Sequence, residues 1–146
     1  MSNQNTDEVL QEIVRMARAG RDFYSGSYAS VVDAETRTAF ACLIDEKNRL
    51  VADLQPWIEQ TSLAPRSSRA DAAEKMYRAA RTAFNGRTTA NVAGALGFGE
   101  DQLLGRVERA FMVARLPALR HLLRTHVAQL QICRAAMWRL TERLAA

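Results

Sequence analysis

The stretch LRHLLRTHVAQLQICRAAMWRLTERL, residues 119–144, carries the strongest structural signal in the chain. Apolar or weakly polar residues recur in it at alternating spacings of four and three, which is a heptad pattern. The residues on this stripe are Leu119, Leu123, His126, Leu130, Cys133, Met137, Leu140 and Leu144. Because an α-helix completes a turn every ~3.6 residues, they share one face. The stretch therefore predicts a long amphipathic helix that begins at about Pro117, a residue suited to a first helical turn.

Other segments show helical periodicity, and capping residues mark several of their ends. Asp33 is a suitable N-cap for a helix over residues 34–60, and Pro56 should kink that helix or loosen its last turn. The predicted helices cover residues 6–29, 34–60, 69–84, 100–115 and 117–144.

The region between the second and fourth long helices is the least regular part of the pattern. Ser68 and Asp71 resemble a capping box that opens the short helix 69–84. Residues 86–99 are rich in Gly and Thr and predict no more than a turn of helix. Four longer helices with short connections within each pair indicate an all-α fold. We expect an antiparallel four-helix bundle with one short accessory helix, in a single domain over residues 1–146.

Composition and cysteine usage limit the class of protein. Apolar residues make up 48% and charged residues 25% of the chain, the balance of a globular protein. The polar, acidic start MSNQNTDEVLQEIV does not resemble a signal peptide, and no segment reaches the ~18 apolar residues of a membrane span. Cys42 and Cys133 lie far apart, without a CxxC context, and indicate reduced thiols rather than a disulfide framework. These features predict a cytoplasmic protein.

Four segments resemble one bacterial protein family. They are EVLQEIVRMARAGRDFY (8–24), ETRTAFACLIDEKNRLVADLQ (35–55), DQLLGRVERAF (101–111) and LPALRHLLRTHVAQLQICRAAMWRL (116–140). In pattern and order they are similar to a family of ferritin-like four-helix bundles catalogued as a domain of unknown function. The likeness extends from about Thr6 to Leu140, with residues 86–99 as an apparent insertion, and includes the pair Glu108–Arg109.

The resemblance raises the question of a metal site. A ferritin-like fold can hold two iron ions with one Glu on each of two helices and Glu-x-x-His on each of the others. The weak candidates in this chain are Glu46, Glu108 and His126. Lys47 stands where the family commonly has Arg, and Arg134 stands where many members have His. Because the ligands are too few and an ammonium repels a metal cation, we expect no metal and no cofactor.

Lys47 interrupts the apolar face of its helix, within the stretch IDEKN, residues 44–48. Its ammonium could extend out of the helix seam to solvent. It could instead pair with an acid such as Glu108 or Asp22, which would offset the cost of burying the charge. A catalytic lysine with a lowered pKa is the third interpretation, without a supporting base or nucleophile. Pairing predicts a buried polar cluster of Lys47, Glu108, His126 and Tyr24.

Charge divides unevenly along the chain. Residues 1–60 carry a net charge of −4 and residues 61–146 a net charge of +8. The main interpretation is that an acidic N-terminal hairpin packs against a basic C-terminal hairpin, with complementary charges within or between subunits. Weak nucleic-acid binding is the lesser alternative, because Arg120 and Arg124 lie on a different side of their helix from Arg139 and no aromatic platform accompanies them.

These observations favour a non-enzymatic helical bundle that acts through protein–protein contacts, either as a homodimer or as a stress or regulatory adaptor. The setting comes from the resemblance alone. The alternatives are a ferritin-like metal-binding oxidoreductase or iron-handling protein, and weak nucleic-acid binding through the basic half.

Overall fold

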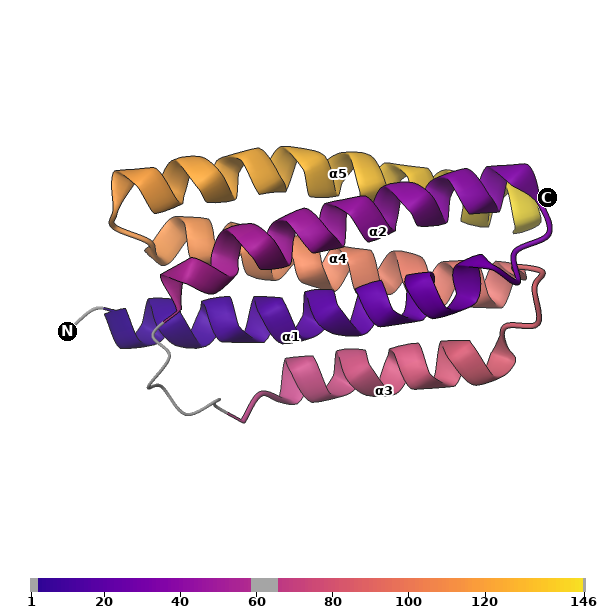
Figure 1. The fold of residues 1–146 in the computed structure, drawn as a ribbon, viewed down its shortest axis with the longest axis horizontal. Coiled ribbons are helices and arrows are strands. Elements are labelled where there is room, and N and C mark those ends of the chain that lie inside the picture. The colour runs from indigo at the N-terminus through magenta and orange to yellow at the C-terminus, as the bar shows by residue number, and fades with distance from the viewer. Residues whose placement is uncertain (1–2, 59–65, 146) are drawn as a thin grey trace.

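The computed structural model describes residues 3–58 and 66–145, and these residues form an all-α protein (Figure 1). The elements are α1 (Asn3–Tyr28), α2 (Ala34–Leu54), the 3-10 turn η1 (Gln55–Trp57), α3 (Ser68–Ala83), α4 (Ala90–Val113) and α5 (Pro117–Ala145). The prediction of an all-α fold is confirmed. Within the described ranges, none of the helices combines the length and apolarity that crossing a bilayer requires.

The helices pack as a bundle with one helix on the outside. α1, α2, α4 and α5 lie side by side along the long axis, and α3 lies against α1 and α4 (Figure 1). α1 contacts α2 and α4, whereas α5 contacts α4 and α2. The chain reverses direction from each helix to the next, so the contacting pairs among α1, α2, α4 and α5 are all antiparallel. α3 carries the chain back along the bundle from the end of α2 to the start of α4.

Side-chain caps explain where several helices begin. Asp33 accepts a hydrogen bond from the backbone N–H of Thr36, as the sequence predicted for the start of α2. The cap of α3 is Ser67, one residue before the predicted Ser68, and it accepts from the N–H of Ala70. The prediction that the second helix extends to residue 60 is wrong, because α2 ends at Leu54 and Pro56 lies in η1. The looser turn expected at this proline is confirmed.

The largest difference from the prediction is the start of α4, which begins ten residues before the expected position 100. Thr89 caps this helix by accepting from the N–H of Val92. Its glycines weaken the local helix preference, but close packing requires them. A Cβ at Gly97 would lie 3.0 Å from the Trp138 ring of α5, and one at Gly99 would lie 3.1 Å from a buried tyrosine hydroxyl of α3. Tertiary contacts therefore stabilise a helix that its composition alone does not indicate.

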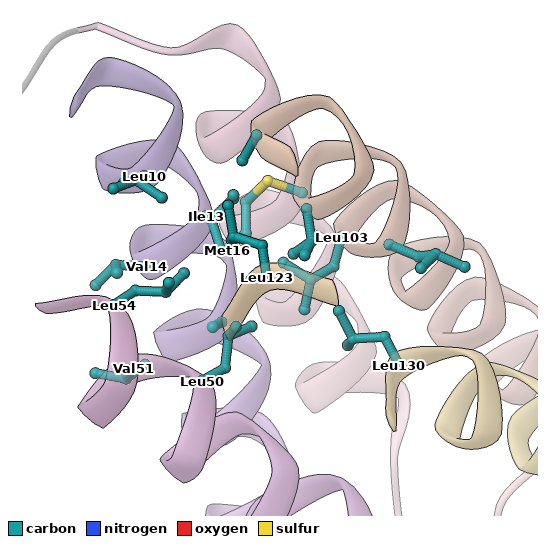
Figure 2. Packing of buried hydrophobic residues seen from close by; sticks show 14 of the residues in the cluster. Leu10, Ile13, Val14, Met16, Leu50, Val51, Leu54, Leu103, Leu123 and Leu130 are labelled. Atoms are coloured by element: carbon teal, nitrogen blue, oxygen red, sulfur yellow. The ribbon is translucent and has the colours of Figure 1, made fainter. Parts of the chain in front are cut away.

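Two apolar clusters form the core. One contains leucines, isoleucine and valines from α1, α2, α4 and α5, and Figure 2 shows Leu10, Leu50, Leu103 and Leu123 converging from these helices. The other is richer in aromatic rings, which come from α1, α2 and α3. The predicted stripe of α5 is confirmed: its residues from Leu119 to Leu140 are buried.

Candidate functional site: a buried lysine–carboxylate–tyrosine cluster

Lys47 lies at the centre of the core, between the two apolar clusters. Its side chain is fully buried, and its Nζ donates to Glu100 Oε1 at 2.6 Å and to Glu46 Oε1 at 3.1 Å. Lys47 stands between Leu43 and Leu50 on α2, which belong to different apolar clusters. The interpretation in which the ammonium reaches solvent is therefore wrong, because α2 directs Lys47 inward and two carboxylates compensate its charge there.

Glu100 of α4 is the acceptor that completes this cluster. Its side chain is fully buried, and its second oxygen, Oε2, accepts from Tyr24 Oη at 3.1 Å and more weakly from Tyr77 Oη at 3.4 Å. One carboxylate thus joins side chains from α1, α2 and α3 to α4. Among the residues of the predicted polar cluster, Lys47 and Tyr24 do meet here, through Glu100.

Glu108 does not belong to the cluster, so that part of the prediction is corrected. It is exposed on α4, two helical turns beyond Glu100. The prediction missed Glu100 because the helix was expected to begin there, which made this residue look like part of a helix end. A signal was present: Leu96, Glu100, Leu103 and Val107 follow the 4-3-4 spacing of a core stripe. Asp22, the other predicted partner of Lys47, is exposed and pairs with Arg21.

Tyr77 reaches the cluster from outside the ring of four helices. It belongs to α3, and two glycines leave space for its hydroxyl group between α1 and α4. A Cβ at Gly20 would lie 3.0 Å from Tyr77 Oη and 3.3 Å from a carbon of Lys47, and one at Gly99 would lie 3.1 Å from the same hydroxyl. The accessory helix therefore contributes a core residue, which the sequence pattern did not reveal.

His126 forms the edge of the cluster on α5. Its Nε2 lies 2.7 Å from Asp53 Oδ2, while its Nδ1 lies 4.0 Å from Glu46 Oε2. Because Asp53 can only accept when ionised, Nε2 carries the proton in this contact. Nδ1 and Glu46 Oε2 are buried without a hydrogen-bond partner in the described part of the chain. His126 is thus a buried imidazole, as its position on the apolar stripe predicted, and its acidic partner Asp53 is a finding of the structure.

Burial and neighbouring charges shift the pKa of several groups in the cluster. Burial alone would lower the pKa of Lys47, but the carboxylates of Glu100 and Glu46 outweigh it and raise that pKa above its ordinary value. Burial, and then Glu100, raises the pKa of both Tyr24 and Tyr77. Burial also raises the pKa of Glu46, against the attraction of Lys47. A catalytic lysine needs a lowered pKa and access to a substrate, and Lys47 has neither.

The cluster also fits a metal ion poorly. Glu46 and His126, two of the candidate ligands, do approach each other, but Lys47 Nζ already engages one oxygen of Glu46 and one of Glu100. A divalent cation bound by these carboxylates would lie next to the ammonium, which it would repel. Within the described residues, no group of three or more His, Cys, Asp or Glu side chains could hold a metal ion.

Ion pairs link the acidic and basic parts of the chain. Arg106 of α4 pairs with Glu12 of α1, and Arg143 Nε of α5 lies 2.7 Å from Glu35 Oε2 of α2. The predicted charge complementarity is therefore present within this chain. No protein-family model matches the chain, and it matches no curated protein and no solved structure.

Proposed function

We propose that this chain is a non-enzymatic, metal-independent helical bundle that acts by binding another protein. The observation that carries the proposal is the Lys47 ammonium between Glu46 and Glu100. These groups are the densest collection of acid–base side chains that we find in the core. They are sealed from solvent and bond to one another, so their charges are compensated inside the fold and do not meet a substrate.

We further infer that the bundle is ferritin-like. Its connectivity supports this, because ferritin-like bundles have one long crossover connection, and here the segment containing α3 plays that part. In such a bundle, inward carboxylates from facing helices surround a cation. Glu46 on α2 and Glu100 on α4 occupy that kind of position, and Lys47 supplies the positive charge from within the chain. The ferritin-like oxidoreductase alternative has no such support from the donor set.

A surface at the end of α4 supports binding to a protein. We call it the α4–α5 corner, defined by Arg109, Met112, Arg115 and Leu116. Met112 is 72% exposed and Leu116 is 54% exposed. Exposed apolar side chains beside arginines are typical of protein interfaces, where Met and Arg are enriched. Arg109, Met112 and Arg115 of this corner line a groove of about 910 Å³.

The charges at the corner favour an acidic partner. Arg106 pairs with Glu12, and Arg120 Nη1 donates to the backbone carbonyls of Phe111 and Ala114, so both of these arginines serve the fold. Arg109 and Arg115 have no ion-pair partner among residues 3–58 and 66–145, although Glu8 also lines the groove. We therefore propose that the occupant is an acidic protein segment that also presents an apolar side chain.

Elemental analysis tests the metal-independent part of the proposal. The full chain, purified without chelators, should contain iron and manganese well below one ion per molecule. Stoichiometric iron or manganese that is retained through gel filtration would contradict the proposal and favour the metal-binding alternative.

Fluorescence anisotropy with two labelled probes tests the binding part: a peptide of alternating Glu and Leu, and a DNA duplex. We expect the peptide to bind, and we expect the double variant Arg109→Glu, Arg115→Glu to bind it roughly tenfold more weakly. Arg139→Glu is the control, because Arg139 is an exposed arginine on α5 outside the corner.

Three outcomes would overturn the acidic-partner proposal. If the peptide does not bind even at low salt, the corner is not such a site. If only the DNA binds, with an affinity that falls steeply with salt, nucleic-acid binding replaces it. If light scattering shows a dimer that the double variant abolishes, a second copy of the chain is the occupant.

A further inference from the structure

Cys42 and Cys133, which lie 91 positions apart in the sequence, meet in the folded chain. Cys42 belongs to α2 and Cys133 to α5, and their Sγ atoms are 3.9 Å apart. The sequence argued against a disulfide framework because it gave no reason for the two residues to be neighbours. Packing of α2 against α5 supplies that reason.

The two thiols differ in accessibility. Cys42 is exposed, whereas Cys133 is buried in the aromatic-rich apolar cluster. Burial raises the pKa of Cys133, so its thiol stays protonated. An oxidant in solution therefore meets Cys42 first, and Cys133 is shielded behind it. An accessible thiol next to a second one is the arrangement found at redox-sensitive cysteines.

We propose that Cys42 and Cys133 are a reversible redox site that reduces one molecule of hydrogen peroxide and forms a disulfide between α2 and α5. The two Sγ atoms must approach from 3.9 Å to the ~2.05 Å of a disulfide, which a small side-chain rotation and helix adjustment can supply. The bond would join the α1–α2 hairpin to the α4–α5 hairpin, close to Lys47.

The reaction proceeds in two balanced steps. The Cys42 thiol loses its proton to solvent, and the thiolate sulfur attacks one peroxide oxygen. The O–O bond breaks, hydroxide leaves and takes up a proton as water, and Cys42 becomes a sulfenic acid. The Cys133 sulfur then attacks the Cys42 sulfur, the S–O bond breaks, and the Cys133 proton leaves with the hydroxyl group as a second water. The two thiols together lose two electrons, and one molecule of hydrogen peroxide is reduced to two molecules of water.

Mass spectrometry of the reduced full chain, treated with a small molar excess of hydrogen peroxide, tests the proposal. The expected product is a monomer that has lost two hydrogen atoms, has no thiol available for alkylation after denaturation, and regains both thiols with dithiothreitol. Its melting temperature should exceed that of the reduced protein by several degrees, because the bond closes a long loop in the unfolded chain.

Two variants separate the roles of the cysteines. In Cys133→Ala, Cys42 should stop at the sulfenic acid and be trapped by dimedone with one adduct per chain. In Cys42→Ser, Cys133 should resist peroxide in the native state, and the melting temperature should not rise. The second variant also controls for methionine oxidation, since it retains all five Met residues.

Several results would refute the proposal. One is a wild-type product in which Cys42 accumulates as sulfenic or sulfinic acid while Cys133 remains alkylatable after denaturation. Another is a disulfide-linked dimer on a non-reducing gel. Persistence of both thiols at a peroxide dose that oxidises Cys42 in Cys133→Ala would also refute it.

Discussion

Replacement of Lys47 with Met is the most informative single perturbation of this fold. Methionine keeps a long, flexible, apolar stem but removes the charge that bonds to Glu100 at 2.6 Å and to Glu46 at 3.1 Å. All three side chains are 1% exposed or less, so water cannot replace the lost partner. Removing one partner of a buried ion pair costs about 3–5 kcal/mol, because the other charge stays buried.

That free-energy loss should be visible in thermal and urea unfolding. For a chain of this size, 1 kcal/mol shifts the melting temperature by roughly 2–4 °C, so we expect Lys47→Met to melt about 6–20 °C below the wild type. The matched control is Arg49→Met on the same helix. Arg49 pairs with Asp45 at the surface, where both side chains are more than 60% exposed, and an exposed pair contributes only about 0.2–1 kcal/mol.

The pH dependence distinguishes lost charge compensation from lost packing. In Lys47→Met the carboxyl groups can stay buried at low cost once protonated, so the folded state of the variant binds protons more readily than its unfolded state. Its deficit relative to the wild type should therefore be largest near neutral pH and should shrink as the pH falls toward 4.5, the usual pKa of Glu46. A variant as stable as the wild type at neutral pH would refute the reasoning, and a deficit independent of pH would assign the loss to packing alone.

The remaining predictions concern the glycines of α4 and the buried tyrosines. Gly99→Ala should destabilise the protein by about 1 kcal/mol in urea unfolding, because its Cβ would lie 3.1 Å from the buried Tyr77 Oη, which donates to Glu100. Gly105→Ala is the control on the same helix: its Cβ would have no neighbour within 4 Å, so it should stabilise by about 0.5–1 kcal/mol. A loss in both variants, or in neither, would contradict the packing account. Because burial raises the pKa of Tyr24 and Tyr77, their contribution to stability is present below pH 10.0 and is lost as the pH rises above it. Urea unfolding across this range should show a steeper decline for the wild type than for the variant with Phe at both positions, and parallel declines would contradict this.

The sequence predicted those parts of the fold whose signal is local. The stripe of α5 is a repeat within a single segment, so the buried face could be identified without its partners. The Asp33 cap and the Pro56 turn likewise depend on a few adjacent residues. The start of α4 could not be found in this way, because Gly97 and Gly99 are helical through contacts with Trp138 of α5 and with α3.

The candidate site was predictable only in part for the same reason. Lys47 was identified because a charge interrupts an apolar stripe, and His126 because it lies on one. The partner of Lys47 could be identified only from the true start of α4. The sequence analysis therefore chose Glu108 and missed Glu100. Tyr77 enters the core from the accessory helix through space left by two glycines, and this depends on the packing of three helices.

The position of Lys47 between two apolar clusters also determines how the helices align along their length. Leucines repeat on several helices, and a slide of α2 by one turn, about 5.4 Å, would still bring leucine against leucine. The same slide would move Lys47 Nζ away from Glu100 and leave the Glu100 carboxylate buried without its cation, while Glu46 would move together with Lys47 on α2. Apolar packing alone allows several alignments of such helices. The buried ion pair raises the free energy of every alignment in which Lys47 and Glu100 do not meet. Lys47 and Glu100 thus fix the position of α2 along α4. This role depends on the geometry of the ion pair and does not require the pair to add net stability.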